Sequence, residues 1–138
     1  KTLHVRMQRH CENSRTIANF LMMHPMVENV YWPGLPSHPN HQIASEQMKD
    51  FGGMLSFTTK GNNYHKAIKV VERLKIFTLA ESLGGVESLA GHPASMTHAS
   101  IPRAEREKTG VVDSLIRLSI GIEDIEDLKA DLKQALEG

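Results

Sequence analysis

The sequence predicts an α/β fold of the α+β two-layer sandwich type, in which helices cover a small, mostly antiparallel or mixed sheet. Three segments carry apolar residues at helical spacing, and two carry the alternation of half-buried strands. The chain has 138 residues, which suffice for one ordinary domain and are too few for two. These three observations together predict a single domain that contains both helices and strands.

The first half of the chain alternates between helical and strand patterns. In chain order, we predict a helix at 3–23, a strand at 27–32, a helix after residue 40, a strand at 54–59 and a helix at 64–74. Pro25 ends the first helix, because the residue before a proline is pushed out of the α region. Gly61-Asn62-Asn63 is expected to supply a turn and the cap of the third helix. The apolar stripe of the first helix contains Met7, Cys11, Ala18 and Leu21.

The second half predicts two further strands and a last helix. In chain order, we predict a strand at 75–80, an irregular segment at 81–101, one or two helical turns at 103–108, a strand at 115–122 and a helix from 125 to 136. The last helix has an acidic first turn and later lysines, as the helix dipole favours. An irregular segment of this length inside a small domain is often functional.

Composition excludes several classes of protein. Sixteen basic and sixteen acidic residues give a formal net charge of zero, which does not favour a nucleic-acid binder of the strongly basic kind. No apolar run has the length of a membrane span, so no membrane partner is expected. One cysteine cannot form an internal disulfide, and this fits a cytoplasmic protein.

The eight histidines do not predict a metal site. His38 and His41 lie on a proline-rich stretch, and neither a second thiol nor an HExxH pattern accompanies them. We expect His92 and His98 to be structural. Cys11 is expected to be a small buried hydrophobe.

Arg117 is the most unusual residue of the predicted strands. Alternation in 115–122 places Ile116, Leu118, Ile120 and Ile122 on one apolar face and Arg117 on the other. Two interpretations stay open: an arginine paired to a structural carboxylate, or a bidentate clamp for a carboxylate or phosphate. Ser82 and Thr97 are likewise either hydroxyl donors in a site or turn residues that satisfy the backbone.

Several strings then point to a known family. They are KTLHVRMQRHCENS at 1–14, PGLPSHPNHQIASEQM at 33–48, FGGMLSF at 51–57, and ESLGG, MTHAS and LIRLSIG within 78–136. With these strings the chain resembles the C-terminal domain of the pyridoxal-phosphate (PLP)-dependent transsulfuration enzymes. That family comprises cystathionine γ-synthase, cystathionine γ-lyase, cystathionine β-lyase and methionine γ-lyase, enzymes of methionine and cysteine metabolism.

The resemblance implies a division of labour between two domains. It implies the C-terminal domain of a fold-type I PLP enzyme, with residues 1–24 as the inter-domain connecting helix and 25–138 as the substrate-side domain. The family's PLP-binding domain, with its Schiff-base lysine, has no counterpart here, so we expect no cofactor-binding residue in this chain and no activity from it alone. We interpret the chain as a piece of a longer protein, which the resemblance implies is a homotetramer.

The resemblance also implies roles for four residues. Arg117, in LIRLSIG, matches the arginine that binds the substrate α-carboxylate. Ser82, in ESLGG, matches a serine that orients the Schiff-base lysine, and Thr97, in MTHAS, matches a threonine close to that serine. Glu81 matches a position that varies among members, where a glutamate attracts the distal amino group of cystathionine. Ser82 and Thr97 are thus the catalytic candidates, and Arg117, Ser82 and Glu81 are the substrate-binding candidates.

Other functions remain open at this point. Glu81 favours a γ-synthase or γ-lyase acting by γ-replacement or elimination over a methionine γ-lyase or a cystathionine β-lyase. A different class is a non-catalytic interaction module derived from this domain. An open reading frame upstream that encodes a Schiff-base lysine in the same frame distinguishes the enzyme from the module.

Overall fold

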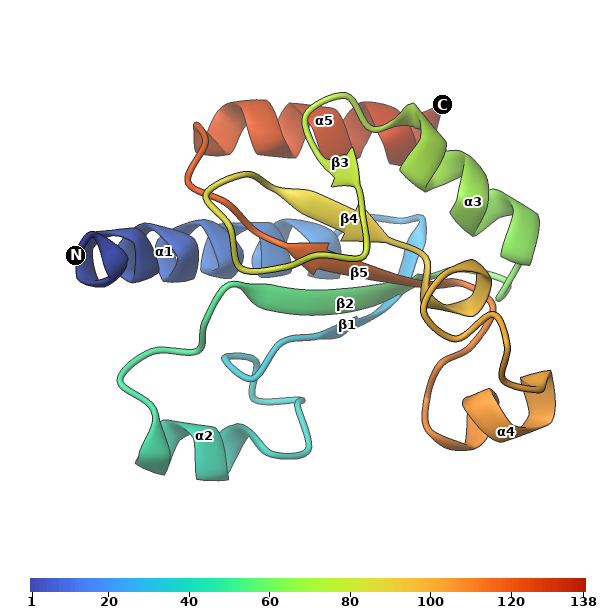
Figure 1. The fold of residues 1–138 in the computed structure, drawn as a ribbon, viewed down its shortest axis with the longest axis horizontal. Coiled ribbons are helices and arrows are strands. Elements are labelled where there is room, and N and C mark those ends of the chain that lie inside the picture. The colour runs from blue at the N-terminus through green and yellow to red at the C-terminus, as the bar shows by residue number, and fades with distance from the viewer.

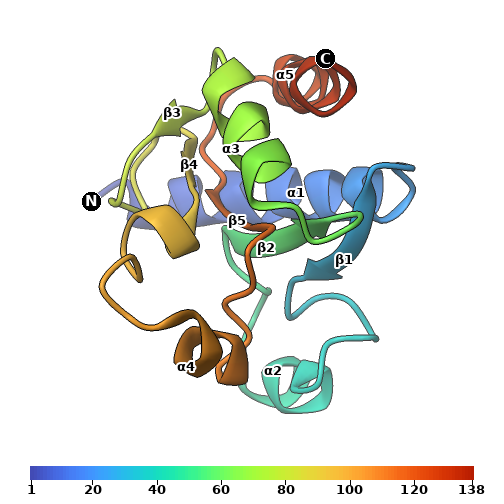
Figure 2. The same ribbon diagram turned by 90° about the vertical axis from the view of Figure 1, so that its right-hand side faces the viewer.

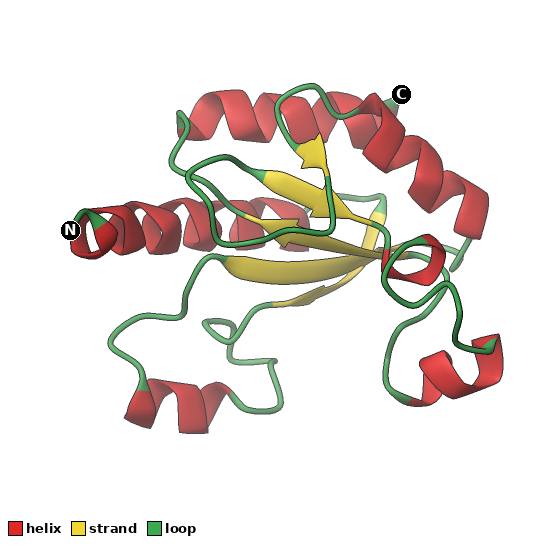
Figure 3. Ribbon diagram, viewed as in Figure 1, coloured by secondary structure: helices red, strands yellow, loops and turns green.

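The computed structural model describes all 138 residues and places five strands and five α-helices around one core (Figures 1 and 3). The helices are α1 (Leu3–Met22), α2 (His41–Gln47), α3 (Tyr64–Arg73), α4 (Arg103–Lys108) and α5 (Ile125–Glu137), with a short 3-10 helix η1 at Pro93–Ser95. The strands are β1 (Val27–Tyr31), β2 (Met54–Thr59), β3 (Thr78–Leu79), β4 (Leu89–Gly91) and β5 (Leu115–Ser119).

The five strands form one mixed sheet in the order β1-β2-β5-β4-β3. The pairs β1–β2, β2–β5 and β4–β5 are antiparallel, and only β3–β4 is parallel. Strand β5 is central, and its Arg117 lies between Ser56 of β2 and Gly91 of β4. The predicted fold class, a small and mostly antiparallel sheet covered by helices, is confirmed.

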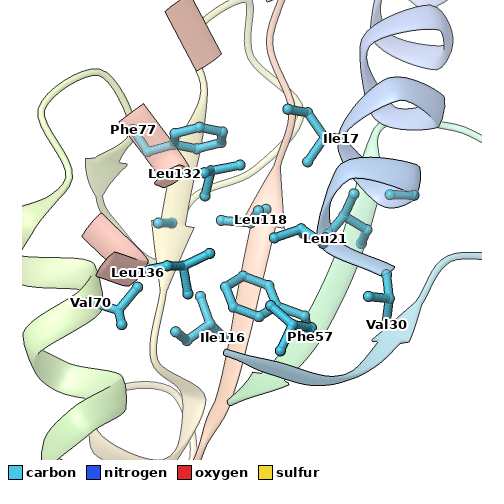
Figure 4. Packing of buried hydrophobic residues seen from close by; sticks show 14 of the residues in the cluster. Ile17, Leu21, Val30, Phe57, Val70, Phe77, Ile116, Leu118, Leu132 and Leu136 are labelled. Carbon is cyan, nitrogen blue, oxygen red and sulfur yellow. The ribbon is translucent and has the colours of Figure 1, made fainter. Parts of the chain in front are cut away.

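A single hydrophobic core joins α1, α3 and α5 to one face of the sheet (Figure 4). Ile116 and Leu118 of β5 are fully buried in it, and Phe57 of β2 lies beside them. The helices contribute Ile17, Ala18, Leu21, Ala67, Val70, Val71, Leu128, Leu132, Ala135 and Leu136. No member of this core comes from α2 or α4, which lie on the lower side of the molecule in the views of Figures 1 and 2.

Side-chain caps begin α3 and α5. The Asn63 side chain accepts a hydrogen bond from the Lys66 backbone N–H at 3.0 Å, as predicted. Asp124 accepts from the backbone N–H groups of Glu126 and Asp127 at the start of α5. No helix of the molecule combines the length and the apolar character that a membrane crossing requires.

The strand predicted at 75–80 is wrong for most of its length, since only Thr78–Leu79 pair in the sheet. The cause is Asp131 of α5. Its carboxylate accepts the backbone N–H groups of Lys75, Ile76 and Phe77 at 2.8–3.1 Å, so these groups do not join the sheet.

The segment 81–101 was predicted to be irregular, but it contains β4 and η1. Each is three residues long, too short to show a period in the sequence.

The strand predicted at 115–122 ends at Ser119. Beyond it, the backbone of Gly121 donates to the Ser88 hydroxyl and that of Ile122 to the Val86 carbonyl, instead of continuing a strand ladder. Ile122 is therefore 39% exposed and not part of the apolar face. The predicted stripe of α1 is also wrong at Met7, which is 38% exposed, because the first turns of α1 extend past the core.

Candidate functional site

Arg117 projects from the central strand to the face of the sheet that the main core does not use. Ile116 and Leu118 point into the core. Because successive side chains of a strand point to opposite faces, Arg117 points to the other face. Its side chain passes Gly91 of the neighbouring strand β4: a Cβ atom at Gly91 would lie 3.7 Å from Nη2 of Arg117. The guanidinium thus reaches the segment that follows β3.

The guanidinium is only partly used by the protein. Its Nη2 donates to the backbone carbonyl oxygens of Glu81 and Ser82, both at 3.1 Å. Nη1 and Nε make no hydrogen bond, and no carboxylate lies within 4.0 Å of the group. Because a guanidinium has five N–H donors in a plane, several remain free for an external acceptor. An arginine held by a structural carboxylate, the first of the two interpretations of Arg117, is therefore not what the structure shows.

A structural arginine–carboxylate pair does exist, at another place in the fold. Arg106 of α4 is buried, and its Nη2 donates to the carboxylate of Asp113, whose other oxygen lies 3.0 Å from Nη2 of Arg103. Nη1 of Arg106 donates to the Val111 carbonyl. This cluster fixes the connection between α4 and β5, and it shows by contrast how Arg117 lacks an internal anion.

The loop that carries Glu81 and Ser82 is fixed to β5 and to the residues after it. The Gly84 backbone N–H donates to Oγ of Ser119 at 2.8 Å, and Ser119 is buried two residues beyond Arg117 on the same face of β5. At the end of the loop, the Ser88 backbone N–H and hydroxyl donate to the two carboxylate oxygens of Glu123, at 2.6 and 2.8 Å. The position of the two carbonyl groups that hold Arg117 is therefore fixed by side chains from β5 onward.

Sequence reasoning missed Ser119 and Glu123 as parts of this arrangement. Alternation did place Ser119 on the face of Arg117, and that was the only available signal. Both contacts join residues 35 positions apart, so the sequence alone does not reveal them.

Three of the four predicted site residues line one small pocket. The pocket has a volume of about 10 Å³ and is lined by Arg117, Glu81 and Thr97, together with Ala80, Gly91, His92, Pro93 and Met96. The side chain of Ser82 does not line it, and Ser82 meets Arg117 only through its backbone carbonyl. The carboxylate of Glu81 forms no ion pair, and Oγ1 of Thr97 lies 2.8 Å from Nδ1 of His98.

His92 is structural, as expected. Its ring is buried, with Nε2 at 2.7 Å from the Asp113 carbonyl oxygen and Nδ1 at 2.8 Å from Oγ of Ser95. Cys11 is also buried, and burial raises the pKa of its thiol. No group of three or more His, Cys, Asp or Glu side chains is arranged to hold a metal ion.

The pocket beside Arg117 does not fit PLP. No lysine lines it, and its volume is that of about one water molecule. What the residues fit is one anionic group at the free edge of the guanidinium, with a carboxylate as the matching geometry. Arg117 thus has free donors for one anionic group, and the pocket beside it has neither a lysine nor the volume that PLP requires.

Comparisons with known proteins agree with the resemblance of the sequence. The profile of the family described as "Cys/Met metabolism PLP-dependent enzyme" matches residues 1–137. Cystathionine β-lyase of Coxiella burnetii is 60% identical over 136 residues, which are 99% of this chain and 35% of that protein. Cystathionine γ-lyase of Dictyostelium discoideum is 58% identical over 137 residues, again 99% of this chain and 35% of that protein.

A solved structure gives the same answer for the fold. The cystathionine γ-synthase of Xanthomonas oryzae pv. oryzae, solved with aminoacrylate and cysteine, superposes with a TM-score of 0.92 at 51% identity. The match covers 99% of this chain and 35% of that one, so the chain spans about a third of the length of the proteins it matches. With a profile match over almost every residue, the chain belongs to the Cys/Met metabolism family of PLP-dependent enzymes.

Proposed function

We propose that this chain is the substrate-side, C-terminal domain of a PLP-dependent enzyme of the cystathionine γ-synthase or γ-lyase type, and that Arg117 binds the α-carboxylate of its amino-acid substrate. The enzyme acts on sulfur amino acids by γ-replacement or elimination. Because the chain spans about a third of its relatives, the activity belongs to a longer protein in which other residues hold the cofactor.

The observation that carries this proposal is that only one nitrogen of the Arg117 guanidinium donates hydrogen bonds within the chain. Two backbone carbonyls fix Nη2, and the remaining N–H groups have no acceptor within the chain. A substrate carboxylate that binds to this edge makes parallel charge-assisted hydrogen bonds, which set its orientation as well as its position. Such a fixed carboxylate holds the Cα–H bond in one direction, and this is the main requirement for its removal as a proton.

The other three residues have supporting roles. The exposed hydroxyl of Ser82 orients the Schiff-base lysine of the longer protein, which moves protons to and from the substrate. Thr97 lines the pocket beside Arg117 and adds a hydroxyl to its polar lining. PLP, when bound by the longer protein, supplies the electron sink that stabilises a carbanion at Cα.

Glu81 supports the γ-type of reaction within the family. Its carboxylate is exposed at the Arg117 pocket and has no cationic partner in the chain, so it is available to the distal ammonium group of cystathionine. The second candidate is a β-lyase or methionine γ-lyase. It is favoured by relatives named cystathionine β-lyase, at 60% identity, and L-methionine γ-lyase of Fusobacterium nucleatum, at 53%.

Product analysis of the longer protein tests the proposal. We expect the reading frame that contains this chain to encode an enzyme that releases cysteine and 2-oxobutyrate from cystathionine, or that forms cystathionine from a homoserine ester and cysteine. Release of homocysteine and pyruvate supports the β-lyase, and release of methanethiol from methionine as the main reaction supports the methionine γ-lyase. A protein that binds no PLP and turns over none of these substrates is an interaction module and contradicts the proposal.

A further inference from the structure

A second and larger pocket lies where the α1–β1 turn, α3 and the end of α5 meet. It has a volume of about 520 Å³, within the range of pockets that bind small molecules. It shares no lining residue with the pocket beside Arg117. In Figure 1 the C-terminal end of α5 lies next to α3 at this place. The proposed function gives this pocket no role.

One wall of the pocket is cationic. Lys66, Lys69 and Arg73 are spaced by three and four residues on α3, so they share one side of the helix, and all three line the pocket. None of them forms an ion pair with an acidic side chain. Glu137, the last residue of α5, is the only acidic residue among the lining residues. The three cationic side chains therefore outnumber the one acidic side chain of the lining.

A buried hydrogen-bond donor at the same pocket lacks an acceptor. The imidazole of His24 is 8% exposed, and its Nδ1 accepts the backbone N–H of Met26 at 3.1 Å. In the neutral ring the proton is therefore on Nε2. This Nε2 makes no hydrogen bond, although Oε1 of Glu137 lies 3.5 Å away. The hydroxyl of Thr59, which also lines the pocket and is 4% exposed, has no partner either.

These groups share a requirement for acceptor oxygens. The His24 Nε2–H and the Thr59 hydroxyl need acceptors, because a buried donor without one costs free energy. The two lysines and Arg73 favour an anion as the source of those oxygens. The half-exposed carboxylate of Glu137 lies 3.5 Å from Nε2 and forms no hydrogen bond with it. Val70 and Leu136 add apolar surface to the lining.

We propose that this pocket binds a small ligand with an oxyanion head, a phosphate or carboxylate group, next to a short apolar body. The head forms ion pairs with Lys66 and Lys69, and its oxygens replace the Glu137 carboxylate in front of the His24 imidazole. The apolar body contacts Val70 and Leu136. The site is separate from the substrate pocket and does not depend on the proposed function.

Two probes with the same ring and different heads test the site, namely phenyl phosphate and benzoate. Binding to the chain is measured by calorimetry at low ionic strength and located by the NMR signal of the His24 ring. Phenyl phosphate should bind more tightly than benzoate, because a phosphate monoester carries a charge of about −1.5 to −2 near pH 7. Raising the ionic strength should weaken both, since the cations are exposed.

Variants on exposed positions give the decisive comparison. The double variant Lys66→Ala with Lys69→Ala should lower the affinity for phenyl phosphate by about tenfold, which corresponds to the loss of two favourable exposed ion pairs. Glu137→Gln should tighten it by at least about twofold, because it removes the competing carboxylate. The matched controls are Lys133→Ala, which removes an exposed α5 cation outside the pocket, and Asp127→Asn, which removes an exposed α5 acid outside it. Both should leave affinity unchanged.

The proposal fails on any of three results. One is a dissociation constant above about 10 mM for both probes, too weak for a built site. Another is an equal loss of affinity in the Lys133→Ala control, which would mean that only net charge matters. The third is binding that leaves the His24 signal unmoved. All four lysine and acid variants change exposed side chains, and circular dichroism verifies that each one is folded.

Discussion

Asp131 is a buried acid that fixes the backbone of residues 75–77. It lies on α5 and is 4% exposed. Oδ1 accepts from the Lys75 N–H at 2.9 Å and from Nε2 of Gln134 at 3.0 Å, and Oδ2 accepts from the Ile76 and Phe77 N–H groups at 2.8 and 3.1 Å. We predict that Asp131→Asn lowers the free energy of unfolding of the chain by about 2–4 kcal/mol.

The magnitude follows from counting acceptors. Asparagine keeps the volume and one oxygen, so one pair of donors stays bound while the other pair faces an amide NH₂ group. Two buried or half-buried donors lose their acceptor, at about 1–2 kcal/mol each, and the surviving bonds lose the help of the charge. A loss of this size is a large fraction of the roughly 5–15 kcal/mol that stabilises a typical domain.

The effect of Asp131 also has a defined pH dependence. Burial raises the pKa of this carboxyl, but the hydrogen bonds from Lys75, Ile76, Phe77 and Gln134 together lower the pKa by more than burial raises it. The pKa of Asp131 therefore lies below its ordinary value. A lowered pKa in the folded state means that the stabilisation is present above the pKa of the unfolded state, about 3.9. It is lost as the pH falls through the lower pKa of the folded state.

Urea unfolding followed by circular dichroism measures this difference. Asp127→Asn, on the exposed first turn of the same helix, is the control and should cost less than about 1 kcal/mol. The difference in free energy of unfolding between the wild-type chain and Asp131→Asn should be largest near pH 7 and should decrease as the pH falls below about 4. A change under about 0.5 kcal/mol at pH 7, or a gap that stays constant down to acid unfolding, would refute the reasoning.

Two further predictions concern the isolated chain. It should form no stable imine with PLP at one defined lysine, because no lysine lines the Arg117 pocket; trapping with borohydride and peptide mapping measures this, and a single modified lysine in high yield contradicts it. The chain should also self-associate, because Leu3 and Val5 on the first turns of α1 are 60% and 67% exposed beside half-exposed Met7. Sedimentation should show this association at high concentration, Leu3→Lys with Val5→Lys should reduce it, and a strictly monomeric chain that binds no hydrophobic dye contradicts it.

The helices and the long strands of this fold were open to prediction because each carries its own signal. In α3 and α5 the apolar residues recur at helical spacing, and the caps Asn63 and Asp124 stand at their starts. In β5 the alternation of Ile116, Arg117 and Leu118 gave the correct faces. Local pattern is enough where an element is long and one face is buried.

The short strands β3 and β4 depend on pairing partners elsewhere in the chain, because β3 pairs only with β4 and β4 also pairs with the central strand β5. Asp131 withdraws 75–77 from the sheet, although it lies 54 to 56 residues away in the sequence. One signal for it was available, since Asp131 interrupts the apolar stripe between Leu128 and Leu132, where an acid needs buried donors. The sequence alone does not say which donors these are.

The candidate site was predictable in the same partial way. Alternation singled out Arg117, and the resemblance named Glu81, Ser82 and Thr97. The contacts that hold the loop of Glu81 and Ser82 against β5, through Ser119 and Glu123, are all long-range hydrogen bonds. Their geometry arises from the folding of distant segments and leaves no periodic trace in the sequence.

Arg117→Ala in the longer protein that carries this chain tests the central claim most directly. The PLP absorption spectrum serves as the control for cofactor binding, and steady-state kinetics give kcat/KM for the amino-acid substrate. Loss of a desolvated charge pair costs about 2–5 kcal/mol, so kcat/KM should fall by roughly thirtyfold to several-thousand-fold while the spectrum is unchanged.

Arg117→Lys should recover only part of this loss, because an ammonium keeps the charge and lacks the planar fork. If Arg117→Ala keeps kcat/KM within about threefold of the wild type, less than the worth of one ordinary hydrogen bond, Arg117 does not bind the substrate carboxylate and the account is wrong.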